Sequence, residues 1–117
     1  MLDLYELIQK IQKRPAMYLG QPTLSHLRTF LAGYIFARRQ QGIAATAQEQ
    51  AFPSFSTWLQ QQFPAQNQQY WDEIILAACP RDRDPWEFFS QLFQEFTATS
   101  VQGDLSQQTQ PSNLVLK

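Results

Sequence analysis

One stretch decides the fold: Asp84-Pro85-Trp86-Glu87-Phe88-Phe89-Ser90-Gln91-Leu92-Phe93-Gln94-Glu95-Phe96. Asp84 suits the N-cap of a helix, Pro85 suits the first helical position, and Glu87 at the third position completes a capping-box pattern. The apolar side chains that follow fall within about 160° of a helical wheel, and polar side chains fill the remainder. The stretch therefore predicts an amphipathic helix whose aromatic side faces a core.

Four earlier segments show the same helical spacing of apolar side chains. They are residues 2–13, a segment from Thr23 or Ser25 to about Gln41, residues 54–63, and a segment from about Gln66 to Cys79, expected to be the most buried. Proline ends three of them, because it disfavours helical geometry in the residue before it. Residues 42–53 have no clean period and predict a loop. With no repeat and no alternating strand pattern, we expect an all-α, compact single-domain bundle of about five helices over residues 1–98.

The C-terminal residues 99–117 differ from the rest in composition. Between Val101 and Asn113 they are rich in glutamine and in turn-prone residues, which argues against stable secondary structure. The chain then closes on the apolar triplet Leu114-Val115-Leu116. We therefore predict an extended polar tail whose apolar end docks on the bundle or on a second copy of the chain.

Composition excludes several classes of protein. The 117 residues carry a formal net charge of -1, glutamine is the commonest residue, and Cys79 and His26 are single. One cysteine cannot form a disulfide framework or a multi-cysteine zinc site. No apolar run approaches the roughly 20 residues of a membrane span, and no signal-peptide pattern is present. We expect a cytoplasmic protein with no cofactor and no membrane contact. We also expect no nucleic-acid partner, because the excess of basic residues is too small for nucleic-acid binding.

Charge is distributed unevenly along the chain. Residues 1–39 hold six basic and two acidic side chains, whereas residues 70–104 hold seven acidic and two basic ones. Such asymmetry reflects internal pairing or a charged face offered to a partner. The acidic half supplies our candidate partner-binding residues, which are Asp72, Glu73, Glu87, Gln91, Gln94 and Glu95. An alternative binding region lies in the basic half and comprises Arg14, Tyr18, Arg28 and His26.

No pattern identifies a catalytic residue. His26 falls on the polar side of its helix, and general acid–base catalysis needs an orienting partner that the sequence does not reveal. Cys79 is expected at a helix C-terminus, where the dipole disfavours a thiolate. The carboxylates of Asp84 and Glu87 are explained by capping.

The segment Arg14-Pro15-Ala16-Met17-Tyr18-Leu19-Gly20 is the most distinctive motif. We predict a structural role for Pro15, Met17, Tyr18 and Gly20: the proline ends a helix, the next side chains tuck under the bundle, and Gly20 adopts a positive φ. Arg14 is expected to be held by a carboxylate or by carbonyl groups at a helix end.

This motif resembles the Arg-Pro-Gly-Met-Tyr-Ile-Gly signature near the ATPase region of the DNA gyrase B subunit. The following stretch, Ala32-Gly33-Tyr34-Ile35-Phe36-Ala37, lacks the acidic and amide pair that holds magnesium and nucleotide in that family. The later glycine motifs are also missing, so we reject an ATPase function.

A broader resemblance covers most of the chain. Its pattern is similar to that of a family of small bacterial all-helical proteins with a Lys-Arg-Pro-x-Met-Tyr-Leu-Gly signature, here Lys13 to Gly20. The further matches are Thr23 to Leu27, Gly33-Tyr34, Phe55 to Leu59, Trp71 to Leu76 and Phe88 to Phe96. The residues before Trp71, Asn67-Gln68-Gln69-Tyr70, depart from the family's polar stretch. Some relatives lie beside toxin genes, so the resemblance implies an immunity-like protein that binds and blocks a toxin, without catalytic residues.

The sequence thus favours a non-enzymatic protein-interaction module with a protein partner. Two alternatives stay open, a small ligand-binding domain or enzyme that uses the basic-half region, and a structural subunit of an assembly. A homo-oligomer is compatible with each of these interpretations.

Overall fold

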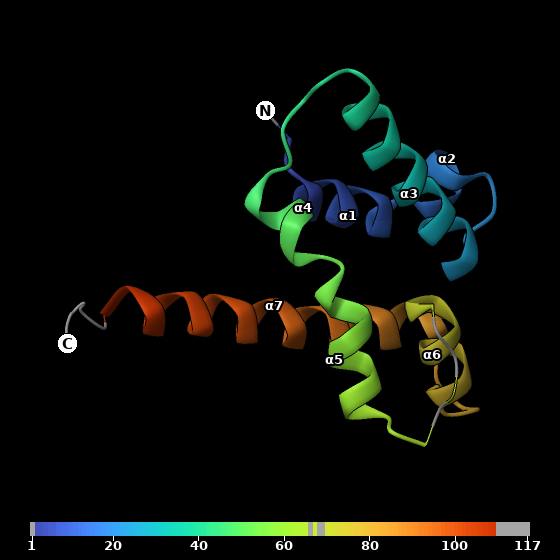
Figure 1. The fold of residues 1–117 in the computed structure, drawn as a ribbon. Coiled ribbons are helices and arrows are strands. Elements are labelled where there is room, and N and C mark those ends of the chain that lie inside the picture. Colours follow the sequence, from blue (N-terminus) through green and yellow to red (C-terminus); the bar gives the residue numbers. More distant parts are fainter. Residues whose placement is uncertain (1, 66, 68–69, 110–117) are drawn as a thin grey trace.

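The computed structural model describes residues 2–65, 67 and 70–109, with side chains as far as residue 99. The described residues form seven α-helices and no strand, as Figure 1 shows, so the prediction of an all-α fold is confirmed. Helix α7 runs along the molecule, α5 crosses it, α6 lies at its N-terminal end, and α1, α2 and α3 group on one side.

The N-terminal part holds α1 (Leu4–Lys13), α2 (Pro15–Leu19) and α3 (Leu24–Gln40). Asp3 and Glu6 form a capping box at the start of α1, and the Thr23 side chain caps α3. Capping by such side chains satisfies backbone N–H groups that have no partner within the helix. The apolar stripe expected on the first helix is buried, namely Leu4, Leu7, Ile8 and Ile11.

Two short helices account for the difference between the five helices expected and the seven observed. Helix α2 lies within the motif at residues 14–20, where no helix was expected; Pro15 stands in its first turn and Gly20 is its C-cap. Helix α4 (Ala47–Ala51) lies within residues 42–53, so the prediction of a loop there is wrong. Its start is a capping box formed by Thr46 and Glu49, a local signal that outweighs the missing period.

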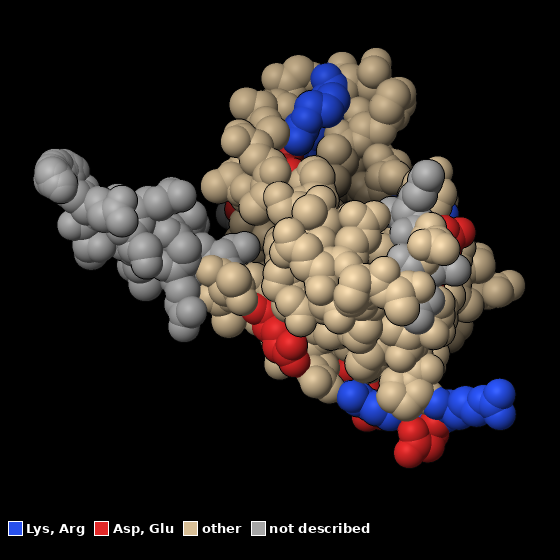
Figure 2. Space-filling model, turned by 60° about the horizontal axis from the view of Figure 1, so that its bottom comes forward, with Lys and Arg blue, Asp and Glu red and all other residues tan. Residues whose placement is uncertain are grey.

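The C-terminal part comprises α5 (Ser54–Gln62), α6 (Trp71–Ala78) and α7 (Pro85–Thr109). Helix α5 has no charged residue, and three glutamines end it. Figure 2 accordingly shows a broad face almost free of charge, with Lys, Arg, Asp and Glu gathered mainly along its margins. The three glutamines that end α5 are exposed to solvent and add no charge.

Helix α7 continues well beyond the predicted end of the last helix. Residues 99–109 were expected to be extended, but they are helical as far as Thr109. Every residue from Trp86 to Thr109 retains its backbone N–H donor, since the next proline is Pro111, and glutamine and alanine favour helix. The apolar triplet at 114–116 lies outside the described residues.

An aromatic cluster forms the centre of the core. Phe55 of α5 is completely buried and lies edge-on to Phe93 of α7, with ring centroids 5.5 Å apart. Trp71 of α6 stacks on Phe89 of α7 at 5.4 Å. The prediction that the aromatic side of the last helix faces a core is therefore confirmed, and α6 and α5 supply the rings that it packs against.

Helix α6 itself is less buried than expected. Ile74 and Ile75 are fully buried, but Leu76 is 48% exposed and the preceding Tyr70 is 52% exposed. The apolar side chains that surround this helix on a wheel therefore do not all face the core. The most enclosed aromatic side chains belong to α5 and α7 instead.

We predict that Phe89→Ala lowers the free energy of unfolding by about 3–5 kcal/mol, because it removes a fully buried ring and leaves a cavity. Chemical denaturation monitored by circular dichroism measures this loss. Phe36→Ala is the matched control: Phe36 is 64% exposed, and its truncation should change stability by less than about 0.5 kcal/mol. Equal losses in the two variants would contradict the proposed role of the cluster.

Candidate functional site

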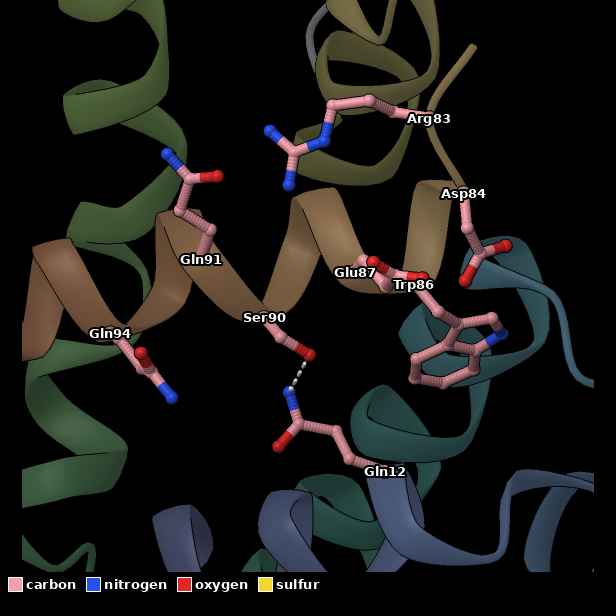
Figure 3. A pocket seen from close by; sticks show the side chains of 8 residues that line it. All are labelled: Gln12, Arg83, Asp84, Trp86, Glu87, Ser90, Gln91 and Gln94. Carbon is pink, nitrogen blue, oxygen red and sulfur yellow. Dashed lines mark hydrogen bonds between the residues drawn. The ribbon is translucent and has the colours of Figure 1, made fainter.

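A hollow on the described surface lies between Gln12 of α1 and the outward side of α7, and we call it the α1–α7 hollow (Figure 3). Its volume is about 530 Å³, and it is open to solvent. The residues that line it are Gln12, Arg83, Asp84, Trp86, Glu87, Ser90, Gln91 and Gln94. Most of these side chains are polar, so the hollow offers hydrogen-bonding groups rather than an apolar pocket.

The outward side of α7 builds one wall of this hollow. Glu87, Gln91 and Gln94 are spaced by four and three residues, so they lie on one side of the helix. Across the hollow, the Nε2 amide of Gln12 donates a hydrogen bond to Ser90 Oγ at 3.0 Å. This bond between α1 and α7 fixes the distance between the two walls.

The end of the hollow near the N-terminus of α7 is also held in place. The Trp86 indole N–H donates to the carbonyl of Pro22, which ties the start of α7 to the segment before α3. The Arg83 guanidinium lies 5.2 Å from the centre of the Phe88 ring. Asp84 and Glu87 each carry a negative charge and Arg83 carries a positive one, so the formal charges of the residues that line the hollow sum to -1.

The structure therefore brings together three of the six candidate residues of the acidic half, Glu87, Gln91 and Gln94. Glu95 lies one turn after Gln91 and accepts a hydrogen bond from its amide at 3.1 Å. Glu73 is exposed on α6 and does not line this hollow.

Asp72 does not belong to this surface. Its side chain is only 3% exposed, and its Oδ1 lies 2.6 Å from Arg28 Nε, which joins α6 to α3. The Arg28 guanidinium also covers the ring of Tyr70, 4.3 Å from its centre. The expectation that Asp72 projects toward a partner is wrong, because an Arg of the basic half neutralises it inside the fold.

A second hollow, which we call the α1–α2 hollow, has a volume of about 220 Å³. It is lined by Lys10, Lys13, Arg14, Met17 and Tyr18. The alternative region of the sequence analysis is therefore divided, since Arg14 and Tyr18 meet here while Arg28 and His26 do not line it. His26 is exposed and shares a hydrogen bond with Thr23 at the start of α3.

The motif at residues 14–20 behaves as predicted in part. Gly20 has a φ of 79°, a conformation that favours glycine, and its N–H donates to the Ala16 carbonyl. Tyr18 is partly buried and packs against the core, as expected. Met17, however, is 64% exposed, because the short helix α2 turns it outward. Arg14 is exposed too, and no carboxylate or carbonyl holds it among the described residues.

A buried ionic cluster escaped the sequence analysis. The Glu49 side chain is 1% exposed; its Oε1 accepts a hydrogen bond from Arg39 Nη2 at 2.6 Å, and its Oε2 lies 2.5 Å from Arg38 Nε. Burial alone would raise the pKa of Glu49, but the hydrogen bonds from Arg39 and Thr46 and the charges of both arginines hold this pKa below its ordinary value of 4.5. The Thr46-Ala47-Gln48-Glu49 capping box was the sequence signal for this position.

Comparisons with known proteins leave the family of this chain open. No family model matches it, and searches of curated proteins and of solved structures also find no match. Within the described residues, no helix is long and apolar enough to cross a membrane. The same residues contain no group of three His, Cys, Asp or Glu side chains placed to hold a metal ion.

The lowered pKa of Glu49 predicts how stability depends on pH. A carboxyl group with a lower pKa in the folded state stabilises the fold above its unfolded pKa, and this contribution is lost as the pH falls through the folded pKa. We expect the free energy of unfolding to fall as the pH drops below about 4.5, and Glu49→Gln to reduce this dependence. Urea titrations between neutral pH and the acid limit of folding measure both effects.

At neutral pH, Glu49→Gln should cost about 3 kcal/mol, because it leaves the buried Arg38 without its counter-charge. Glu73→Gln is the control, since Glu73 is exposed and its amide should be tolerated within about 0.5 kcal/mol. An unchanged acid dependence in Glu49→Gln would show that this cluster does not control acid stability.

Proposed function

We propose that this protein is a non-enzymatic interaction module that binds a polypeptide partner with basic side chains through the α1–α7 hollow. The supporting observation is the position of Glu87, Gln91 and Gln94. These residues line one hollow with Gln12 of a distant segment, while the aromatic core uses only the opposite side of α7. Side chains that are not needed for packing are free to serve recognition.

The chemistry of this hollow suits a polypeptide. Each glutamine amide can donate to a backbone carbonyl and accept from a backbone N–H, and Gln91 and Gln94 carry such amides at neighbouring positions. Glu87 and the adjacent Glu95 add negative charge, which attracts lysine or arginine side chains and speeds association. The shallow, open shape fits a protein surface or an extended segment better than an enclosed small molecule.

The resemblance of Lys13 to Gly20 to immunity-like bacterial proteins extends this proposal. In that interpretation the partner is a toxin, and binding in the hollow blocks it. A ligand-binding domain or enzyme built on Arg14, Tyr18, Arg28 and His26 has less support, because only the first two of these residues share a hollow.

Site-specific photo-crosslinking tests the proposal. A photo-reactive amino acid replaces either Gln91 in the hollow or Gln60, which is exposed on α5 and lines neither hollow described above. In cells of the source organism, the probe at position 91 should crosslink one basic polypeptide, identified by mass spectrometry, and the probe at position 60 should not. Equal crosslinking at both positions would refute a specific site.

A charge reversal then tests the electrostatic part. Glu87→Lys combined with Gln91→Lys should weaken capture of that polypeptide by about 100-fold, equivalent to about 2.7 kcal/mol. Gln60→Lys combined with Gln61→Lys adds positive charge at exposed sites of α5 and should leave capture unchanged. If the partner is toxic when expressed alone, the parent protein should restore growth and the double variant in the hollow should not. Retained affinity in that variant would exclude the hollow.

A further inference from the structure

The α1–α2 hollow carries an inference that does not depend on the first proposal. We propose that it is a second docking surface, which takes an acidic polypeptide segment with an apolar side chain between its carboxylates. Lys10, Lys13 and Arg14 would hold the carboxylates, and Met17 with Tyr18 would contact the apolar side chain.

The first argument is the pairing of charges in the basic half. Of the six basic residues in positions 1–39, Arg28 pairs with Asp72, and Arg38 and Arg39 pair with Glu49. The remaining three, Lys10, Lys13 and Arg14, have no ion pair among the described residues, and all three line this one hollow. No carboxylate lines it. The basic excess that the fold does not use internally is therefore concentrated at one place.

The second argument is the apolar surface beside these cations. Met17 is 64% exposed, one of the most exposed large apolar side chains described. Tyr18 is half-buried and packs against the core, so it forms a fixed wall rather than a mobile side chain. Methionine, tyrosine and arginine are enriched in protein interfaces, and methionine adapts its shape to an incoming side chain.

The third argument is that the backbone presents this surface rigidly. Pro15 stands at the start of α2, and Gly20 ends it with a φ of 79°. Because α1 and α2 pack closely, the backbone at Met17 is held beside the last turn of α1. A backbone ordered before binding lowers the conformational entropy lost when a partner docks, and the remaining loss falls on the exposed side chains.

The combination favours a polypeptide over other anions. Free phosphate would use the cations but gain nothing from Met17 and Tyr18. An anionic membrane is recognised by an amphipathic helix that offers its apolar face, whereas the apolar side of α1 is buried in the core and the cations line a hollow of about 220 Å³. An acidic segment with an apolar residue uses both kinds of group at once.

The test uses the full chain and a fluorescein-labelled synthetic peptide composed of glutamates with two central leucines. Fluorescence anisotropy should show saturable binding that weakens as salt screens the charges. Lys13→Glu should weaken binding by about tenfold, since it reverses one of the three charges in the hollow. Arg81→Glu makes the same change in charge at an exposed site that does not line this hollow, and should alter affinity less than about twofold.

A second pair of variants tests the apolar contact. Met17→Ser should weaken peptide binding by about fivefold, the order of a lost apolar interface contact. Phe36→Ser is its control, because Phe36 is equally exposed, at 64%, on another helix. Circular dichroism melting curves establish that all four variants fold.

Three results would overturn the proposal. Equal effects of Lys13→Glu and Arg81→Glu would show attraction by overall charge. Equal affinity for an all-glutamate peptide would show a simple anion site that makes no use of Met17 and Tyr18. Absence of saturable peptide binding, with or without binding to phosphatidylserine vesicles, would exclude a polypeptide ligand. The Gln91→Lys variant changes only the α1–α7 hollow and should bind the peptide normally. Loss of partner binding at that hollow and loss of peptide binding at the α1–α2 hollow are therefore separate outcomes.

Discussion

The N-terminal half depends on one buried carboxylate. Glu49 lies between Arg38 and Arg39 at the end of α3, while its own backbone N–H bonds to Thr46 at the start of α4. Glu49 and Arg38 are almost completely buried, and taking such charges out of water is costly unless each has a partner, so these ion pairs tie α4 to the end of α3. A short helix without an apolar period is therefore held in place by charge.

The same cluster extends to the N-terminus. The Thr46 hydroxyl donates to Asp3 Oδ1 at 2.8 Å, and Gln48 Oε1 accepts from the Tyr5 N–H at 2.7 Å. Asp3 in turn caps α1. The start of α1, the end of α3 and all of α4 are thus joined through polar contacts, whereas α5, α6 and α7 are joined through aromatic rings. Buried leucine and isoleucine side chains hold both parts of the fold; the parts differ in the interaction that is added, which is polar in the N-terminal part and aromatic in the C-terminal part.

This difference explains how much of the fold the sequence predicts. The longer helices, such as α1, α3 and α7, have regularly spaced apolar residues, and this spacing is enough to predict them from the sequence. Helix α4 depends on a single capping box, and the ion pair of Arg28 with Asp72 joins residues far apart in the sequence. The spacing of apolar residues predicts neither feature. Turn-prone residues near the C-terminus predicted an early end for α7, but in the absence of proline they do not interrupt its hydrogen bonds.

The candidate sites divide in the same way. Spacing along α7 places Glu87, Gln91 and Gln94 on one side of the helix, because the helix itself fixes which residues share a side. It could not predict that Gln12 faces them, since that requires the packing of α1 against α7. Nor could it separate the outward carboxylates from Asp72, whose burial depends on Arg28 of another helix.

Because the chain carries few charges, each charge without an ion-pair partner has a large effect on the local electrostatic potential. Only 16% of the residues are charged, and glutamine covers much of the surface without adding charge. The fold pairs the arginines of α3 internally with Glu49 and Asp72. On such a neutral background, a few unpaired groups dominate the local electrostatic potential, because no neighbouring charges of opposite sign offset them. The net positive α1–α2 hollow and the net negative α1–α7 hollow include different residues of α1, so one helix contributes to two surfaces of opposite net charge.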